Sequence, residues 1–306
     1  MKIRVTALLL AMVLLLCGCA HTGDVSLTEG QGTTGATTTA PTTTPATQST
    51  TQPSTTPITN PTTTPTTQIP TQTTTPPATE PEDEYNGPIG QPGPNGYLVV
   101  IDAGHQRKAD NGKSPVGPGS SVMKKNVSSG TTGSFTGIYE YVLNLEVAKM
   151  LEQELLKRGY GVIMVRNSHD VRITNIERAQ IANYNDADAF IRIHANGSTN
   201  AKEKGAMTIC QTKNNPYNGS IYQECYDLSL AILDGICASS GCDRLYVWET
   251  DTMAGINWSE VPVTIVEMGY MTNKEEDELL ATDEYRMKMA LGMANGLDTF
   301  FGITRE

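Results

Sequence analysis

Four residues with metal-binding or proton-transfer side chains stand in separate stretches of this chain. His105 follows VVIDAG, Glu140 lies in IYEYVLNLEVAKML, and His194 lies in FIRIHANG. Two imidazoles and one carboxylate form a common catalytic zinc shell that leaves one coordination position open for water. Glu267, in VPVTIVEMGYMTN, supplies the further carboxylate that such a site needs to take a proton from that water. If these four residues meet in the fold, the sequence predicts a zinc hydrolase.

His105, Glu140 and His194 each also have a structural role open to them. His105 or His194 alone could be a packed or capping residue. Glu140, in the first turn of a predicted helix, could serve only to interact with the helix dipole, a contribution of ~0.3–1 kcal/mol. The metal hypothesis therefore depends on the elements that bring these side chains together.

Buried strands are predicted to carry three of the four residues to one edge of a sheet. Continuous apolar runs cover residues 97–104, 187–194 and 262–267, and they end at or next to His105, His194 and Glu267. Such runs are typical of strands in a sheet covered on both faces. Active sites gather where the carboxyl ends of these strands meet. Glu140 is expected in the first turn of a helix over residues 139–158, ended by Gly159.

The remaining elements complete an α/β pattern over one domain. Apolar patterns predict strands and helices, while the Gly-, Ser-, Lys- and Asn-rich segment 106–137 is expected to be a long surface loop that lines a cleft. The expected strands cover residues 161–166, 205–211 and 245–248, and the expected helices cover residues 173–184, 220–239 and 283–301.

The N-terminal residues 1–19 have the features of an export signal. Lys2 and Arg4 precede an apolar run that ends in LCGC. This end is similar to a bacterial lipobox, which predicts Cys19 as the lipidated residue after cleavage and the outer face of the membrane as the location. Cys17 as acceptor, or an ordinary signal peptide that releases a secreted protein, remains an alternative. Several acyl chains would anchor the protein stably.

Residues 20–95 form a Thr- and Pro-rich linker without Lys or Arg. Such a segment buries too little apolar surface to repay its ordering entropy, so we expect it to be disordered or PPII-like and to act as a spacer. Residues 96–306 form the predicted catalytic domain, expected to be monomeric. The formal net charge of −11 argues against nucleic acid as a partner.

The cysteines of this domain leave two interpretations open. Cys210, Cys225, Cys237 and Cys242 are an even number in an exported domain, so two disulfides are one interpretation, and free buried thiols are the other. Cys225 and Cys237 lie several turns apart on one predicted helix and are not expected to bridge each other.

At these motifs the domain resembles the zinc-dependent N-acetylmuramoyl-L-alanine amidases of the Amidase_3 type, which cleave bacterial peptidoglycan. Matching segments appear in the family order as VVIDAGH, E-x-x-LNLEVAKMLEQELLKRGYGVIMVR, ERAQIAN, IHAN and PVTIVEMGYMTNKEED. The resemblance implies a single three-layer α/β domain with a largely parallel central sheet. It also implies Zn²⁺ bound by His105, Glu140 and His194, with Glu267 as the catalytic carboxylate.

The chain departs from the family pattern at two places beside the proposed ligands. Gln106-Arg107 replaces the common Gly pair after the first histidine, and Arg192 replaces the common Ser before IHAN. Both departures concern substrate detail rather than catalysis. Arg178, Asn183 and Asn196 match family positions and are interpreted as structural or supporting residues, while Asp102, next to the first motif, is given no role.

The function implied by the resemblance is hydrolysis of the amide bond between N-acetylmuramic acid and L-alanine in peptidoglycan. The same shell would serve a zinc carboxypeptidase or endopeptidase acting on cell-wall peptides. A non-catalytic peptidoglycan-binding module is the alternative from another class of protein.

Overall fold

A computed structural model describes residues 85–305 of the chain. The predicted signal peptide, Cys19 and most of the predicted linker lie outside these residues. Within the described part, no helix is long and apolar enough to cross a membrane. Residues 85–95, which the sequence analysis assigned to the linker, pack against the domain. Tyr85 stacks on Tyr184 with ring centroids 4.3 Å apart, and the Gly90 amide donates to Asn185 Oδ1 at 2.9 Å.

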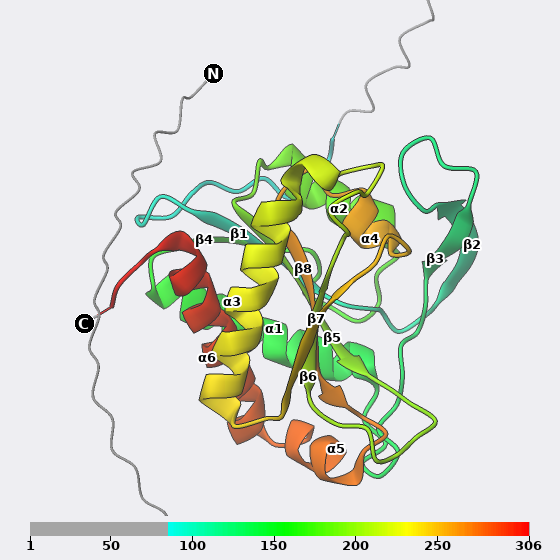
Figure 1. The fold of residues 1–306 in the computed structure, drawn as a ribbon, viewed down its shortest axis with the longest axis vertical. Coiled ribbons are helices and arrows are strands. Elements are labelled where there is room, and N and C mark those ends of the chain that lie inside the picture. Colours follow the sequence, from blue (N-terminus) through cyan, green and yellow to red (C-terminus); the bar gives the residue numbers. More distant parts are fainter. Residues whose placement is uncertain (1–84, 306) are drawn as a thin grey trace, which may run out of the picture. The chain divides into compact units, whose positions relative to one another are not determined.

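A six-stranded sheet runs through the domain (Figure 1), in the order β4-β1-β5-β8-β6-β7. The strands β4, β1, β5 and β8 are parallel to one another, and only β6 pairs antiparallel, with β8. The predicted largely parallel sheet is therefore confirmed. The strands are β1 Leu98–Ala103, β4 Gly161–Met164, β5 Ala189–Asn196, β6 Ala206–Cys210, β7 Arg244–Glu249 and β8 Val263–Tyr270.

Helices cover both faces of this sheet. Alternate residues of β1 belong to two separate cores: Val99 and Ile101 pack with α1, α3 and α6, while Leu98 and Val100 pack with α2 and α4. This division explains why the strand is buried at every position. The helices are α1 Glu140–Lys157, α2 Asn175–Tyr184, α3 Tyr222–Ser240, α4 Ala254–Asn257, α5 Lys274–Leu280 and α6 Asp283–Phe301, with a 3₁₀ turn at Gly219–Ile221.

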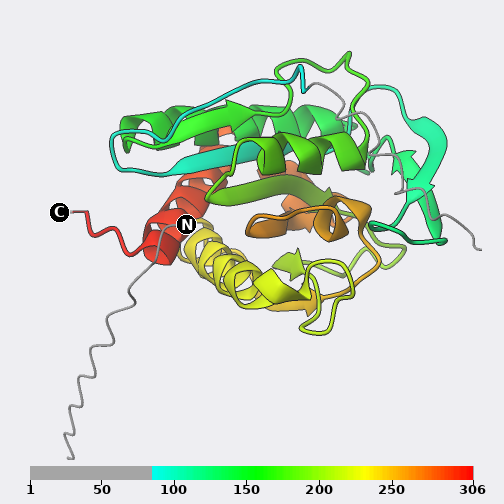
Figure 2. The same cartoon turned by 90° about the horizontal axis from the view of Figure 1, so that it is seen from above.

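Glycines let α3 and α6 approach each other closely. In Figure 1 and Figure 2, α3 (yellow) lies against α6 (red). A Cβ at Gly296 would lie 2.7 Å from Ile232 Cα, and a Cβ at Gly292 would overlap the backbone of Ile236. The two helices therefore form one tightly packed layer beneath the sheet face opposite α2 and α4.

The structure differs from the sequence-based description of the domain at three points. Segment 106–137 is not simply a loop, because β2 (Asp110–Pro115) and β3 (Met123–Val127) pair antiparallel within it. Its hairpin is exposed and polar, and therefore lacks the apolar pattern that would have revealed it. The strands β5 and β8 also continue beyond His194 and Glu267, so these residues lie inside strands rather than at their ends. The short helices α4 and α5 were not predicted.

All four cysteines of the domain are free. Cys225 and Cys237 both lie on α3 and are not bridged, as predicted. Cys210 and Cys225 are buried, whereas Cys237 and Cys242 are half-buried with their Sγ atoms 3.3 Å apart.

Candidate metal centre

Three ligand-type atoms from three elements converge at one point. His105 Nε2 lies 3.0 Å from Glu140 Oε1, and His194 Nδ1 lies 3.1 Å from both of these atoms. Ligands held ~2.0–2.2 Å from one zinc ion at tetrahedral angles are about 3.3–3.6 Å apart. The three atoms are thus already spaced nearly as a zinc shell requires, and the residues fit a bound metal ion. We call His105, Glu140 and His194 the metal cluster.

The backbone after β1 places His105 in the cluster. His105 has a φ of 62°, in the left-handed region that a non-glycine residue rarely adopts. Gly104 precedes it, and a Cβ at this position would overlap the ring of His194. The Gly-His pair therefore has a physical reason: the glycine makes room for one imidazole while the strained histidine presents the other.

A backbone carbonyl fixes the tautomer of His105. The Nδ1 atom lies 3.0 Å from Ser128 O, so Nδ1–H donates to this carbonyl and the lone pair of Nε2 faces the cluster. Burial lowers the pKa of His194 to about 4, so its imidazole is neutral at pH 7. A neutral imidazole is the form of histidine that metal binding requires.

Glu140 is held by backbone amides rather than left to solvent. It is only 3% exposed, and its Oε2 accepts from Thr131 N at 2.8 Å. Its Oε1 accepts from Ala195 N at 3.2 Å and from Asn144 Nδ2 at 3.3 Å. Burial raises the pKa of this carboxyl, but its close contacts with His105 and His194 outweigh burial and hold the pKa well below its ordinary value. Glu140 is thus an oriented carboxylate, which a dipole interaction alone would not require.

Glu267 stands next to the metal cluster on the neighbouring strand. Its Cα is in register with that of His194 across the parallel β5–β8 pair, so both side chains leave the same face of the sheet. Its Oε2 atom is enclosed and has no hydrogen-bond partner among the described residues. Burial, with a smaller contribution from the charge of Glu140, raises the pKa of Glu267 to about 8. This carboxyl oxygen is free to exchange a proton with a molecule bound at the cluster.

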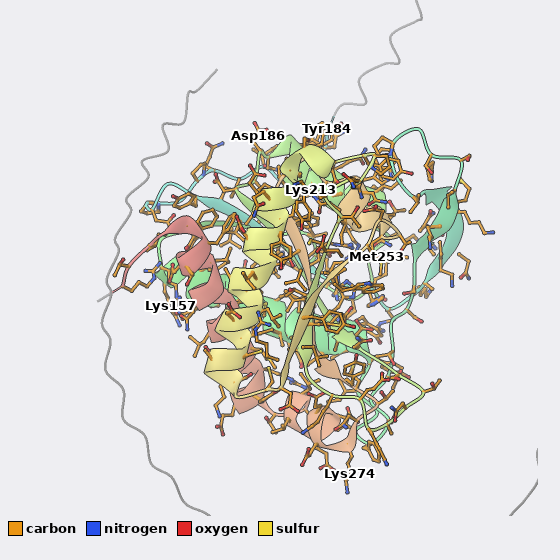
Figure 3. All side chains as sticks on the ribbon, in the orientation of Figure 1. Lys157, Tyr184, Asp186, Lys213, Met253 and Lys274 are labelled. Carbon is orange, nitrogen blue, oxygen red and sulfur yellow. The ribbon has the colours of Figure 1, made fainter. Side chains whose placement is uncertain are left out.

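Two hollows meet at the metal cluster. A smaller cavity of about 240 Å³ lies towards α4, and a larger groove of about 520 Å³ lies on the other side. Both are lined by His105, Ser128, His194 and Glu267. Met253, labelled in Figure 3, lines the smaller cavity. Because both hollows open onto the same cluster, one extended substrate can occupy both with its reacting bond between them.

A buried ionic network supports the loop that carries His105. Asp102 accepts hydrogen bonds from Arg178 Nη1 and, at 2.9 Å, from Arg192 Nε. Arg178 also donates to Ala103 O and His105 O, each at 3.2 Å. The supporting role predicted for Arg178 is seen in these contacts. Asp102, which the sequence analysis left without a role, holds the two arginines rather than a histidine.

The other residues that the sequence analysis compared with the family pattern also have a defined place in the structure. Asn183 donates to Trp258 O at 2.9 Å and accepts from Glu260 N at 2.8 Å, which ties α2 to the segment after α4. Gln106, at one of the two departures from the family pattern, is buried and accepts from Ile173 N and Arg178. Asn196 lines the larger groove.

Comparison with known proteins agrees with this site. The pattern of the Amidase_3 family, described as N-acetylmuramoyl-L-alanine amidase, matches residues 99–299, and the chain belongs to this family. It is therefore an amidase, an enzyme that hydrolyses the amide bond between N-acetylmuramic acid and L-alanine of peptidoglycan, and the family is metal-dependent.

Individual relatives are distant. Over 206 residues the chain is 28% identical to the uncharacterized protein YqiI of Bacillus subtilis, covering 67% of this chain and 85% of that protein. Over 193 residues it is 26% identical to N-acetylmuramoyl-L-alanine amidase AmiA of Escherichia coli, covering 51% of this chain and 66% of that protein. The crystal structure of the amidase Ami1 from Mycobacterium smegmatis shares the fold, with a TM-score of 0.62 and 24% identity over 68% of this chain and 98% of that one.

Proposed function

We propose that this amidase is a zinc enzyme in which His105, Glu140 and His194 hold the metal ion and Glu267 transfers the proton. The observation that carries this proposal is the convergence of three ligand atoms, from three different elements, within 3.1 Å of one another. A packed or capping histidine would not need this convergence.

The donor set supports zinc as the ion. Two neutral imidazoles and one carboxylate, with one position left open, match the shells of zinc hydrolases. Zinc bound there would polarise the substrate carbonyl and lower the pKa of a bound water molecule to about 7. The chain contributes the fixed tautomer of His105 through Ser128 O and the orientation of Glu140 through its amide donors.

Glu267 would move the proton between water and the leaving group. Its unpartnered Oε2 atom accepts a proton as the water oxygen bonds to the carbonyl carbon of the lactyl group. The same carboxyl then donates this proton to the alanine nitrogen as the carbon–nitrogen bond breaks. The products are a lactyl carboxylate on the sugar and a stem peptide with a free N-terminal alanine.

The sequence supports an anchored enzyme outside the cytoplasm, where peptidoglycan lies. Residues 1–19 are proposed to be a lipoprotein signal with Cys19 as the acylated residue, and residues 20–84 to be a spacer before a monomeric domain. Labelling of growing cells with a radioactive fatty acid tests this proposal. The label is expected to be lost in Cys19→Ala. A label retained in that variant would contradict the proposal that Cys19 is acylated.

Analysis of the products tests the catalytic proposal. The purified chain, loaded with zinc, is incubated with isolated peptidoglycan, and newly formed amino termini are labelled and identified. N-terminal alanine is expected with the wild type and with Glu278→Gln, an exposed control on α5. Glu267→Gln should keep zinc but release no alanine, whereas His194→Ala should lose zinc.

The possible results separate the alternatives. New termini other than alanine would indicate a peptidase. Activity retained by Glu267→Gln would remove that residue from the mechanism. Zinc bound without any release of peptide by the wild type would favour a binding module.

A further inference from the structure

Arg192 stands beside the metal cluster without a function in the reaction described above. It precedes His194 by two residues in β5, so both side chains leave the same face of the sheet. Its side chain is only 4% exposed, yet it lines the smaller cavity together with Glu267 and Met253. Arginine is rarely buried unless its charge is balanced.

The charge of Arg192 is not fully balanced by the protein. Asp102 is the carboxylate that contacts it, and Asp102 also contacts the fully buried Arg178. Among the described residues, no further carboxylate forms an ion pair with either arginine. Two buried guanidinium groups thus share one carboxylate. Excess charge in a buried site is costly, and an anion that enters the cavity would relieve it.

The guanidinium group also has hydrogen-bond donors to spare. Nε donates to Asp102 Oδ2 at 2.9 Å, and Nη2 donates to Asn175 Oδ1 at 2.8 Å. A guanidinium carries five N–H donors. Within the described part of the chain, Nη1 has no acceptor. It lies against Gly255 of α4, where a Cβ would overlap it, so the glycine makes room for the charged group beside the cavity.

The two hollows therefore differ in charge. Apart from the catalytic residues, the larger groove is lined by uncharged polar groups, including Thr131, Asn196, Ser198 and Thr272. The smaller cavity has the arginine at its wall. The two halves of the substrate differ in the same way: the muramoyl sugar offers uncharged hydroxyl and acetamido groups, whereas the stem peptide carries free carboxylates. Complementary charge orients a ligand.

We propose that the smaller cavity is the peptide subsite and that Arg192 binds the free α-carboxylate of the second stem residue, a D-glutamyl group. The muramoyl sugar then lies in the larger groove. This inference rests on the proposed function. It predicts that the enzyme prefers stem peptides with a free carboxylate at this position over those in which it is an amide.

A pair of soluble substrates tests this subsite. Two muramoyl tripeptides are compared, identical except for an α-carboxylate or an α-carboxamide on the second residue, and kcat/KM is measured for the full chain loaded with zinc. The wild type should prefer the carboxylate by about 10-fold or more, as expected for a charge-assisted contact. Arg192→Ser, which introduces the common family residue and leaves Asp102 paired with Arg178, should bring the ratio close to 1.

Two further variants control this experiment. Arg192→Lys keeps the charge but loses the planar fork, so the ratio should fall several-fold while the pairing with Asp102 is kept. Arg244→Ser makes the same change as Arg192→Ser at a half-exposed ion pair with Asp234, and should keep the wild-type ratio. Zinc content is measured for every variant.

The outcomes distinguish this inference from the function on which it rests. Wild type that releases N-terminal alanine from peptidoglycan but cleaves both tripeptides equally would overturn the subsite and leave the amidase intact. A wild-type ratio retained by both variants of Arg192 would do the same. Zinc-loaded wild type that releases no alanine from any substrate would overturn the proposed function, and the subsite with it.

Discussion

Replacing Asn144 by alanine should weaken zinc binding without removing a ligand. Asn144 is fully buried on α1, one turn after Glu140. Its Nδ2 donates to Glu140 Oε1 at 3.3 Å and to Gly104 O at 3.2 Å. The amide therefore links a proposed ligand to the backbone beside His105, and its loss should leave both less well oriented.

The size of this effect follows from what the neighbours retain. Gly104 O still accepts from Arg166 Nη2 at 3.1 Å, and Glu140 Oε1 still accepts from Ala195 N. No buried group is left without a partner. The carbonyl oxygen of Asn144 has no hydrogen-bond partner among the described residues, so its removal costs little. The effect therefore comes from the loss of one long hydrogen bond to a charged group. This loss is worth about 1.5–2 kcal/mol, or about 10- to 30-fold in zinc affinity.

Competition with a chromophoric chelator measures the dissociation constant of zinc directly. Asn144→Ala is compared with Asn295→Ala, which makes the same change at an exposed position of α6. The control should bind zinc like the wild type. At saturating zinc, Asn144→Ala should recover most of the wild-type kcat. A folded variant with unchanged zinc affinity, or one that loses more than about 1000-fold, would refute the reasoning.

Two further predictions concern the metal cluster. Gly104→Ala should lower zinc affinity by about 100-fold or more, because the added Cβ would displace the ring of His194. A chelator titration measures the affinity of this variant for zinc. An affinity within a few-fold of the wild type would contradict the contact between Gly104 and His194. Removing the metal should also lower Tm by about 5–11 °C. A metal ion present at 100 times its dissociation constant stabilises the folded state by about 2.7 kcal/mol, and the Tm of a domain of this size changes by about 2–4 °C per kcal/mol. An unchanged Tm after treatment with a chelator would show that no metal ion stabilises the fold.

The sequence predicted the parallel part of the sheet because its strands are buried on both faces. The strand around Val100 and the strand that holds His194 are buried at nearly every position and rich in apolar residues, a pattern that few other elements share. Direction and exposed elements were harder to predict. AMTIC of β6 is buried at all five positions and would look the same in a parallel strand, although it runs antiparallel to β8. The exposed strands DNGKSP and MKKNV have no apolar pattern.

The groups that orient the proposed ligands could not be predicted in the same way. Ser128 O, Thr131 N and Ala195 N are backbone atoms, and any residue type would supply them. The charged network did leave a signal in the sequence. Asp102 and Arg192 each interrupt an apolar run, and a charged residue inside a buried strand must have a partner.

Asp102→Asn tests how far this network supports the fold. Burial raises the pKa of the Asp102 carboxyl, but the charges of Arg178 and Arg192 outweigh burial, and with a smaller effect of His194 they hold the pKa well below its usual range. A lowered pKa in the folded state means that the carboxylate stabilises the fold at pH values above its unfolded pKa of about 3.9. This contribution is lost as the pH falls below that value.

Asp102→Asn should therefore cost about 3–5 kcal/mol at pH 7, because it leaves buried guanidinium groups without a counter-charge. Its disadvantage should shrink between pH 5 and pH 2, because Asp102 of the unfolded wild type takes up a proton in this range while the folded state keeps the carboxylate charged, and the variant has no such group. Urea unfolding at several pH values measures this difference, with Asp234→Asn, at a half-exposed ion pair, as a control expected to change stability by less than about 1 kcal/mol. A cost that does not depend on pH would mean that the side chain stabilises the fold by its shape and not by its charge. Arg178, which holds the backbone of His105 at 3.2 Å, would then owe its position to packing.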